Sequence, residues 1–492
     1  MLIVPGILGF GLVIYSTHWG AGWLYDSFEY IASAQNLAAT GKLGFPTDIT
    51  GIEPLTHYPP LFSLLLGLFE AVGLSMLSHV QYLNALLFST TIILLGVTIY
   101  WMTASEGFAL LGAVLGSISP VMLNVHSWAL SEPLYLTLSI SSILFLAKFL
   151  KKDQFSWLIL AATFSGLAIM TRYVGVSLVI SGSIGILIFP GLIESRKRRI
   201  ILTFCTISLL PLLIWTIRNS LITNTLYDRS FGLNEITAKN LSTLASTLLT
   251  WFIPEVIVRN QIKEITAVLF GLLVLGTGYY LWTKDRSKST HSLMKSLDAS
   301  GSLFYFHGFY ILIYPAVVIT AKQWLDPVIG LTDRMLSPLF ISLLVLMISG
   351  LHVLWSSSKK IDRVLVSTFC LYLVVLFSLE SLPLIRRFHT QGVNTARRVM
   401  VRSTLAPLVT QLAQDGVVYT NSLTWYYLWT GKPANPVELL IIKTPEKPQP
   451  IYVVIFPTAP VPPSYKQALN QLSGKVQLWQ EDPTVAIYRY RQ

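Results

Sequence analysis

The chain has 492 residues, of which 53% are hydrophobic and 12% charged, and its formal net charge at pH 7 is +11. A composition this apolar is typical of a multi-spanning membrane protein and argues against a series of soluble domains. The net charge does not indicate nucleic-acid binding, because the basic residues fall in short clusters between apolar runs, as anchors at an inner membrane face do. Cys205 and Cys370 both lie inside apolar runs, and their positions fit neither a disulfide framework nor a zinc site.

Apolar runs long enough to cross a bilayer, which takes roughly 20 residues, follow one another along most of the chain. The first run has no basic segment before it and no clear small-residue cleavage site, so it is interpreted as a retained span rather than a signal peptide. An all-α polytopic domain over residues 1–385 is predicted, with a first outer loop at 19–80 and a long outer loop at 219–263. About eleven transmembrane helices are expected, at 2–18, 81–102, 107–125, 133–149, 156–171, 174–191, 200–217, 264–282, 302–320, 336–355 and 364–384.

The basic clusters predict the orientation of these spans, because cytoplasmic loops carry an excess of Lys and Arg. They occupy alternate loops, at 148–152, 196–199, 284–288 and 359–363. The intervening loops are then expected outside, and they carry Asp26, Glu132, Arg172, Arg218 and Arg334. This holds only if the apolar run 59–75 is interfacial or re-entrant, since a crossing there would place Asp26 and Glu132 on opposite faces.

The composition changes at about Arg386, where the last span ends. Residues 394–414 show helical periodicity, and four short β-branched or aromatic runs predict strands at 417–419, 451–456, 475–479 and 485–490. Residues 386–492 are therefore expected to form a small soluble α/β domain on the extracytoplasmic side.

The first outer loop begins with Asp26-Ser-Phe-Glu29, a pattern typical of a helix N-cap followed by an acidic residue. The helix would cover 27–39 and end at Gly41 as its C-cap. A catalytic role for Asp26 is compatible with capping, because a cap would hold the carboxylate in place. Glu29 and Tyr30 lie one turn further on, on the same face.

Two further polar motifs also have local structural explanations. His57-Tyr58-Pro59-Pro60 is typical of a helix entry, and His57 has no partner at a metal-ligand spacing. Glu132, in Ser131-Glu132-Pro133, fits a capped, proline-started helix. Because Glu132 is expected on the same face as Asp26, the two carboxylates could form an acid/base pair or bind a divalent cation, and the sequence leaves both open.

Three nearly isolated arginines follow or begin apolar runs in Thr171-Arg172-Tyr173, Arg218-Asn219 and Asp333-Arg334. Any one of them is typical of an interfacial arginine whose stem lies along the membrane. Three on one face suit a lipid phosphate, because a guanidinium is permanently charged and matches phosphate oxygens with two hydrogen bonds.

Taken in this order, the motifs resemble the GT-C glycosyltransferases, and within them the family 39-like branch of protein O-mannosyltransferases and aminoarabinose transferases. The resemblance implies a plasma (inner) membrane enzyme that moves a sugar, with inversion, from a polyprenyl-phosphate donor to a lipid, glycan or protein acceptor. The catalytic residues would be Asp26, which would take the acceptor's proton, and Glu132, which would match the acid of the second outer loop. The substrate-binding residues would be Glu29, Tyr30, His57, Tyr58, Arg172, Tyr173, Arg218, Asn219 and Arg334.

Two departures from that branch limit what the resemblance implies. Ser27 follows Asp26 where some relatives carry a second acid, and Tyr58 stands where the aminoarabinose transferases have a lysine before Pro-Pro. The sugar and the acceptor are therefore not carried over, and relatives differ in their need for a divalent cation.

Two other classes of function remain open. A transporter or flippase of lipid-linked sugars would place ionisable residues near the bilayer midplane and show inverted repeats. Here the polar residues gather at the outer ends of the spans, which favours chemistry at the membrane surface. A non-catalytic assembly protein would instead use the C-terminal domain as a binding module.

Overall fold

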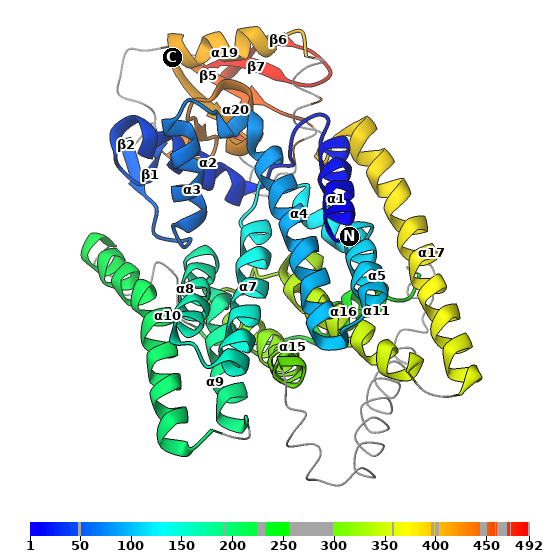
Figure 1. The fold of residues 1–492 in the computed structure, drawn as a ribbon. Helices are drawn as coiled ribbons and strands as arrows, with labels where there is room; N and C mark the ends of the chain where they lie inside the picture. Colours follow the sequence, from blue (N-terminus) through cyan, green and yellow to red (C-terminus); the bar gives the residue numbers. More distant parts are fainter. Residues whose placement is uncertain are drawn as a thin grey trace.

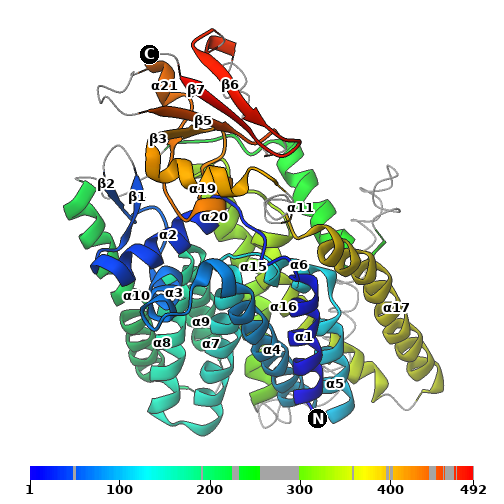
Figure 2. The same cartoon turned by 90° about the horizontal axis from the view of Figure 1, so that it is seen from above.

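The computed structural model describes residues 1–47, 51–189, 192–223, 232–254, 299–356, 359–394, 398, 403–442, 450–457, 459, 470–472 and 474–490. The span expected at 264–282 and the basic cluster at 284–288 lie outside these residues. A body of helices carries a small sheet domain at one end, and helix α20 lies between that sheet and helix α2 (Figures 1 and 2).

Six helices of the described residues are long and apolar enough to cross a membrane. They are α4 (Met76–Thr103), α7 (Glu132–Lys152), α10 (Glu194–Thr223), α15 (Ala299–Trp324), α16 (Asp333–Trp355) and α17 (Lys360–Gln391). Helices α5 (Glu106–Ser117) and α6 (Pro120–His126) form a seventh candidate span, bent by 55°. The bend coincides with Pro120, whose ring disfavours a helical conformation in the residue before it.

The expected count of eleven spans is not confirmed, because several predicted spans are short helices. They are α1 (Ile3–Ser16), α8 (Phe155–Thr171) and α9 (Val176–Ile188), the last preceded by a 3₁₀ turn at Tyr173–Gly175. The run 59–75 forms α3 (Leu61–Ala71), which at 11 residues rises about 16 Å. This is well short of a hydrocarbon core of about 30 Å. The length of α3 suits an interfacial or re-entrant placement, which stays a prediction.

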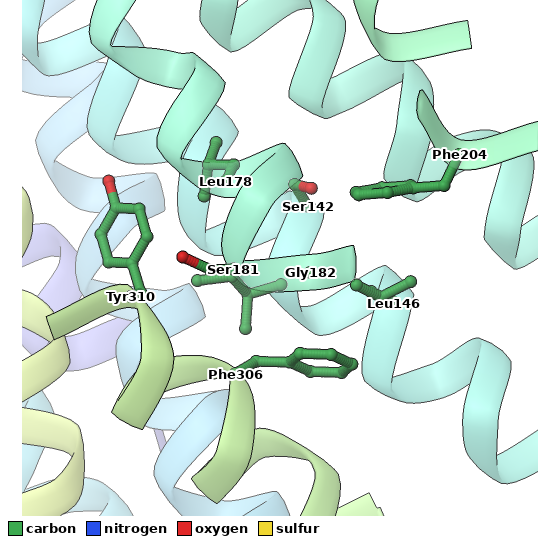
Figure 3. Close-up of a pocket in the computed structure, with 9 residues that line it drawn as sticks. Ser142, Leu146, Leu178, Ser181, Gly182, Phe204, Phe306 and Tyr310 are labelled. Carbon is green, nitrogen blue, oxygen red and sulfur yellow. The ribbon is translucent and has the colours of Figure 1, made fainter. Parts of the chain in front are cut away.

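Helix α7 is at the centre of the body and packs against α4, α8, α9, α15 and α16. In the most apolar stretch of α7, 83% of the residues are buried, because neighbouring helices surround it on every side. A small pocket lies among α7, α9, α10 and α15, with the side chains of Ser142, Ser181 and Phe306 in its lining (Figure 3). No acidic or basic residue is among its described lining residues, so it does not offer groups that would bind a phosphate.

The first loop contains helix α2 (Tyr25–Thr40), which ends at Gly41 as expected. Gly41 has a φ of 73°, a left-handed conformation that glycine adopts without a Cβ clash. A hairpin that the sequence analysis did not predict follows, with β1 (Gly44–Thr47) antiparallel to β2 (Gly51–Pro54). Helix α2 packs against α3, β1 and α20.

The C-terminal domain is a mixed five-stranded sheet with the strand order β4-β3-β5-β7-β6. Strand β3 pairs in parallel with β4 and β5, whereas β7 is antiparallel to β5 and β6. All four predicted strands are present, as β3 (Val417–Thr420), β5 (Ile451–Ile455), β6 (Val476–Glu481) and β7 (Ala486–Tyr490). The short strand β4 (Asn435–Pro436) was not predicted.

Among the described residues of this domain, helices α19 (Ala406–Asp415), α20 (Leu423–Thr430) and α21 (Leu439–Ile442) accompany the sheet. The helix expected at 394–414 is thus represented by the shorter α19, and residues 395–397 and 399–402 lie outside the described ranges. In the long loop expected at 219–263, α10 continues to Thr223 and a further helix, α11 (Ala238–Thr250), is present.

Candidate active site

The carboxylate of Asp26 is not used to cap its own helix, so the capping hypothesis is wrong. Helix α2 begins at Tyr25, and the Ser27 hydroxyl accepts a hydrogen bond from the Leu24 backbone N–H at 3.0 Å. Asp26 Oδ1 instead accepts from the Tyr58 hydroxyl at 2.9 Å, and Oδ2 accepts from Arg334. The side chain is therefore held by two other parts of the chain.

A short backbone bridge brings the segment before α2 beside the segment before α7. The Gly22 N–H donates to Ser127 O, and the Ala129 N–H donates to Gly22 O, both at 2.9 Å. A Cβ at Gly22 would lie 2.6 Å from the Trp128 ring, so only glycine allows this approach. The bridge places Asp26 and Glu132, each a few residues further on, at the same end of the body.

Glu132 is the first residue of α7, is 1% exposed and binds two arginines through one oxygen. Its Oε1 accepts from Arg172 at 2.5 Å and from Arg334. Arg172 follows the last residue of α8, and Arg334 is the second residue of α16. Four separate elements thus contribute to one network, and a buried carboxylate is tolerated there because two guanidinium groups compensate its charge.

The acids and arginines of this network alternate, and their formal charges cancel. Asp26 and Arg334 are its accessible end, with side chains 20% and 31% exposed, whereas Arg172 is 12% and Glu132 2% exposed. Burial by itself would raise the pKa of Asp26, but the Arg334 charge and the hydrogen bonds from Arg334 and Tyr58 outweigh it and hold the pKa below its usual value. Asp26 is therefore ionised at neutral pH.

The first turn of α16, which carries Arg334, is held by residues that the sequence analysis did not assign to the site. The Trp251 indole N–H donates to Asp333 Oδ1 at 2.8 Å, and the Tyr314 hydroxyl donates to Met335 O at 2.5 Å. The Trp251 side chain comes from the expected long outer loop, where the run Trp251-Phe252-Ile253-Pro254 was the available signal. These bonds fix the residues on both sides of Arg334.

The aromatic residues predicted for the site pack together beside Asp26. The Tyr30 and Tyr58 ring centroids are 5.1 Å apart, and His57 meets Tyr58 edge-to-face at 4.7 Å. Tyr30 shares a 3.2 Å hydrogen bond with Ser131, the residue before Glu132. Burial and the nearby charges of Asp26 and Glu29 raise the pKa of Tyr58, so its hydroxyl stays protonated and acts as a donor.

Arg218 and Asn219 belong to a second group of contacts. Arg218 donates to Leu55 O at 2.6 Å, and Asn219 donates to Thr56 O at 3.1 Å, which holds the chain immediately before His57. Tyr173 joins the same group, because its hydroxyl accepts from the Trp215 indole at 3.0 Å, and Arg218 lies over the Trp215 ring at 4.6 Å. Of the three predicted arginines, Arg172 and Arg334 bind the carboxylates, whereas Arg218 binds the loop that ends at Tyr58.

The arrangement does not favour a divalent cation at the two predicted carboxylates. Asp26 and Glu132 both accept from arginine, whose charge would oppose a cation. In the parts of the chain that the structure describes, no group of three or more His, Cys, Asp or Glu side chains could hold a metal ion.

Comparison with known proteins supports the resemblance that the motifs carry. The sequence model of the family described as "Dolichyl-phosphate-mannose-protein mannosyltransferase" matches residues 57–215. No curated protein matches the sequence.

Solved structures match over almost the whole chain. ArnT from Cupriavidus metallidurans bound to undecaprenyl phosphate is 13% identical, with a TM-score of 0.59, over 99% of this chain and 97% of that one. Its apo state is similar at 12% identity and a TM-score of 0.57, again over 99% and 97% of the two chains. The archaeal oligosaccharyltransferase AglB from Archaeoglobus fulgidus is 10% identical, with a TM-score of 0.51, over 92% of this chain and 69% of that one.

The chain therefore has an ArnT-like GT-C fold: a mostly helical membrane domain with a small C-terminal sheet domain. The family model over residues 57–215 and the shared fold both agree with the resemblance to the protein O-mannosyltransferase and ArnT-like glycosyltransferases, and the chain is a multi-pass membrane protein.

Proposed function

We propose that the protein is a membrane glycosyltransferase that moves a sugar from a polyprenyl-phosphate donor to an acceptor hydroxyl or amine at the outer face of the membrane. The observation that carries the proposal is the Asp26–Arg334–Glu132–Arg172 network on this fold. It combines an ionised, partly accessible carboxylate with two fixed positive charges. An acceptor needs a base, and a departing lipid phosphate needs compensating charge.

In the proposed reaction Asp26 accepts the acceptor's proton as the acceptor oxygen or nitrogen bonds to the anomeric carbon. The bond from that carbon to the phosphate oxygen breaks, and the lipid phosphate leaves with the bonding electrons. Attack opposite the leaving group inverts the configuration. An ionised carboxylate has about four lone-pair positions, so Asp26 can accept from the acceptor while Tyr58 and Arg334 remain bound.

Glu132 would act differently from Asp26, because its side chain is only 2% exposed. Its proposed role is to hold Arg172 and Arg334 in place, through the oxygen that both of them bind. Arg334 is the better-placed group to meet a donor phosphate, since it is the more exposed of the two arginines. Arg218, Asn219 and Tyr173 would support this site through the loop before His57.

Replacement of Asp26 by asparagine tests the assignment, because it keeps the size of the side chain and removes the basic oxygen. We expect Asp26→Asn to remain folded and to abolish sugar transfer in reconstituted vesicles. The matched control is Asp153→Asn, at an acid that binds Arg196 on the surface and is 59% exposed. Transfer by the control should be unchanged, and retained transfer by Asp26→Asn would refute the catalytic role.

Mass spectrometry of lipids that co-purify with the protein tests the donor class. A polyprenyl-phosphate sugar bound to the wild-type protein, and retained by Asp26→Asn, would support the proposal. Vesicles also separate catalysis from transport, because a transporter would move the lipid-linked sugar across the membrane without transferring it and without needing Asp26.

A further inference from the structure

Helix α20 of the C-terminal domain is built almost wholly from large aromatic and aliphatic side chains that are buried. Trp425, Tyr426, Tyr427, Leu428 and Trp429 are all between 0% and 7% exposed. A helix that is apolar on every side must be covered on every side. Its own domain covers one side, where the rings of Trp425 and Trp429 pack on Phe456 at centroid distances of 5.7 and 4.9 Å.

Tyr427 faces the other way, toward helix α2. At 100° per residue, it is turned about 200° from Trp425. Its ring meets Phe28 edge-to-face at 5.0 Å, and its hydroxyl donates to Gln35 Oε1 at 2.5 Å. One side chain of the C-terminal domain thus binds α2 at two points that are seven residues apart.

Helix α2 therefore makes contacts on two opposite faces. Phe28 and Gln35 are turned only about 20° from each other around its axis, on the face that meets α20. Asp26 and Tyr30, four residues apart, share the other face, where they contact Tyr58 and Ser131. The contact with Tyr427 lies across the helix from the carboxylate that it supports.

The chain around the end of α17 also holds the segment that leads into α2. The Trp19 indole donates to His389 O at 3.0 Å, and the Asn394 amide donates to Trp23 O at 2.6 Å. Together with Tyr427, these contacts bind the first loop on both sides of Asp26, at Trp19 and Trp23 before it and at Phe28 and Gln35 after it. They all come from residues at the C-terminal side of the membrane domain.

We propose that Tyr427 is a positioning residue, and that the C-terminal domain sets the place of Asp26 against Arg334 by holding the opposite face of α2. The expected effect on sugar transfer rests on the proposed function, whereas the role of Tyr427 in holding α2 does not. A displacement of about 1 Å at a reacting group costs on the order of 10²-fold in rate. Loss of the Tyr427 contact is therefore expected to act on turnover more than on donor binding, which depends on the arginines.

Tyr427→Leu is the principal test, with Trp425→Leu as its matched control on the same helix. Full-length variants in nanodiscs are compared by hydrogen exchange of peptides covering residues 25–40. Transfer is measured as a rate per polyprenyl-phosphate-binding site, which corrects for misfolded protein. Tyr427→Leu should speed exchange in α2 by about 10-fold and lower the rate per site by about 10- to 100-fold. Trp425→Leu should lower the thermal midpoint and leave both readouts near wild type.

Milder variants keep the proposal testable if Tyr427→Leu fails to fold. Tyr427→Phe keeps the ring on Phe28 and removes the hydroxyl, and Gln35→Leu removes its acceptor. Tyr427→Phe should lower the rate per site by about threefold. Gln35→Leu also removes a hydrogen bond to Glu70, so the double variant should be no worse than Gln35→Leu alone, because the bond to Tyr427 is already lost in that variant.

The outcomes separate this inference from the proposed function. Equal exchange in α2 for Tyr427→Leu and wild type, or equal effects of Tyr427→Leu and Trp425→Leu on the rate per site, would overturn the positioning role. If the wild-type protein transfers no sugar, the proposed function fails, and hydrogen exchange still decides whether Tyr427 holds α2.

Discussion

Replacement of Glu132 by glutamine should destabilise the protein more than replacement of either arginine that binds it. Glu132 is 1% exposed, and the same oxygen accepts from Arg172 and Arg334. Breaking a buried ion pair from one side costs about 3–5 kcal/mol, because the remaining charge is left without its counter-ion. Since Arg172 is only 12% exposed, we expect Glu132→Gln to lower the unfolding free energy by about 3–5 kcal/mol.

The loss in unfolding free energy should be smaller for the two arginine variants, and it should depend on which partners the remaining carboxylates keep. Arg172→Gln leaves Glu132 bound by Arg334, so about 2–3 kcal/mol is expected. Arg334→Gln leaves Glu132 bound by Arg172 and Asp26 bound by the Tyr58 hydroxyl. The Arg334 side chain is also 31% exposed, so water replaces part of the hydrogen bonding that the carboxylates lose with the guanidinium group. About 1–2 kcal/mol is expected for this variant.

The order is measured by unfolding in mixed micelles with increasing sodium dodecyl sulfate, followed by tryptophan fluorescence. Asp153→Asn is the control, because Asp153 and Arg196 form an acid–arginine pair with side chains 59% and 42% exposed. Exposed pairs contribute little, so no measurable change is expected. The reasoning is refuted if Arg334→Gln costs as much as Glu132→Gln, or if the exposed control costs as much as either.

Three further predictions concern the groups around Asp26. Tyr58→Phe removes one donor to the Asp26 carboxylate and should lower transfer by about three- to tenfold without changing the amount of folded protein, as measured by size-exclusion yield. Asn219→Leu removes the bond to Thr56 O and should increase proteolysis of the loop at 55–58, whereas unchanged cleavage would show that Asn219 does not hold this loop. The lowered pKa of Asp26 contributes stability above its unfolded pKa of about 3.9, and this is lost as the pH falls through the folded pKa. Unfolding measured between roughly pH 6 and roughly pH 3 should therefore show a smaller acid-induced loss in Asp26→Asn than in wild type.

Much of the architecture follows from local patterns in the sequence. Within the described residues, six of the expected spans are long apolar helices, Gly41 ends α2 in a left-handed conformation, and the β-branched runs of the C-terminal domain are strands. The count of spans was less predictable, because apolarity does not reveal whether a run forms one long helix, a short helix or a bent pair such as α5 and α6.

The roles of the polar residues required the folded chain. By sequence alone Asp26 was equally well explained as a helix cap, but Ser27 makes the local bond and leaves the carboxylate to Tyr58 and Arg334. All three arginines lie at the end of an apolar run, yet Arg172 and Arg334 bind Glu132 and Arg218 binds a backbone carbonyl.

Local sequence thus determined which elements form, because propensity, apolar length and turn residues act within a few positions. The tertiary structure alone decided which charges meet, because Asp26 and Arg334 are 308 positions apart and pair only once four elements pack at one end of the body. The same holds for Tyr427 and Gln35, 392 positions apart. Hydrogen bonds and ion pairs act over a few ångströms, so packing selects partners that no local pattern specifies.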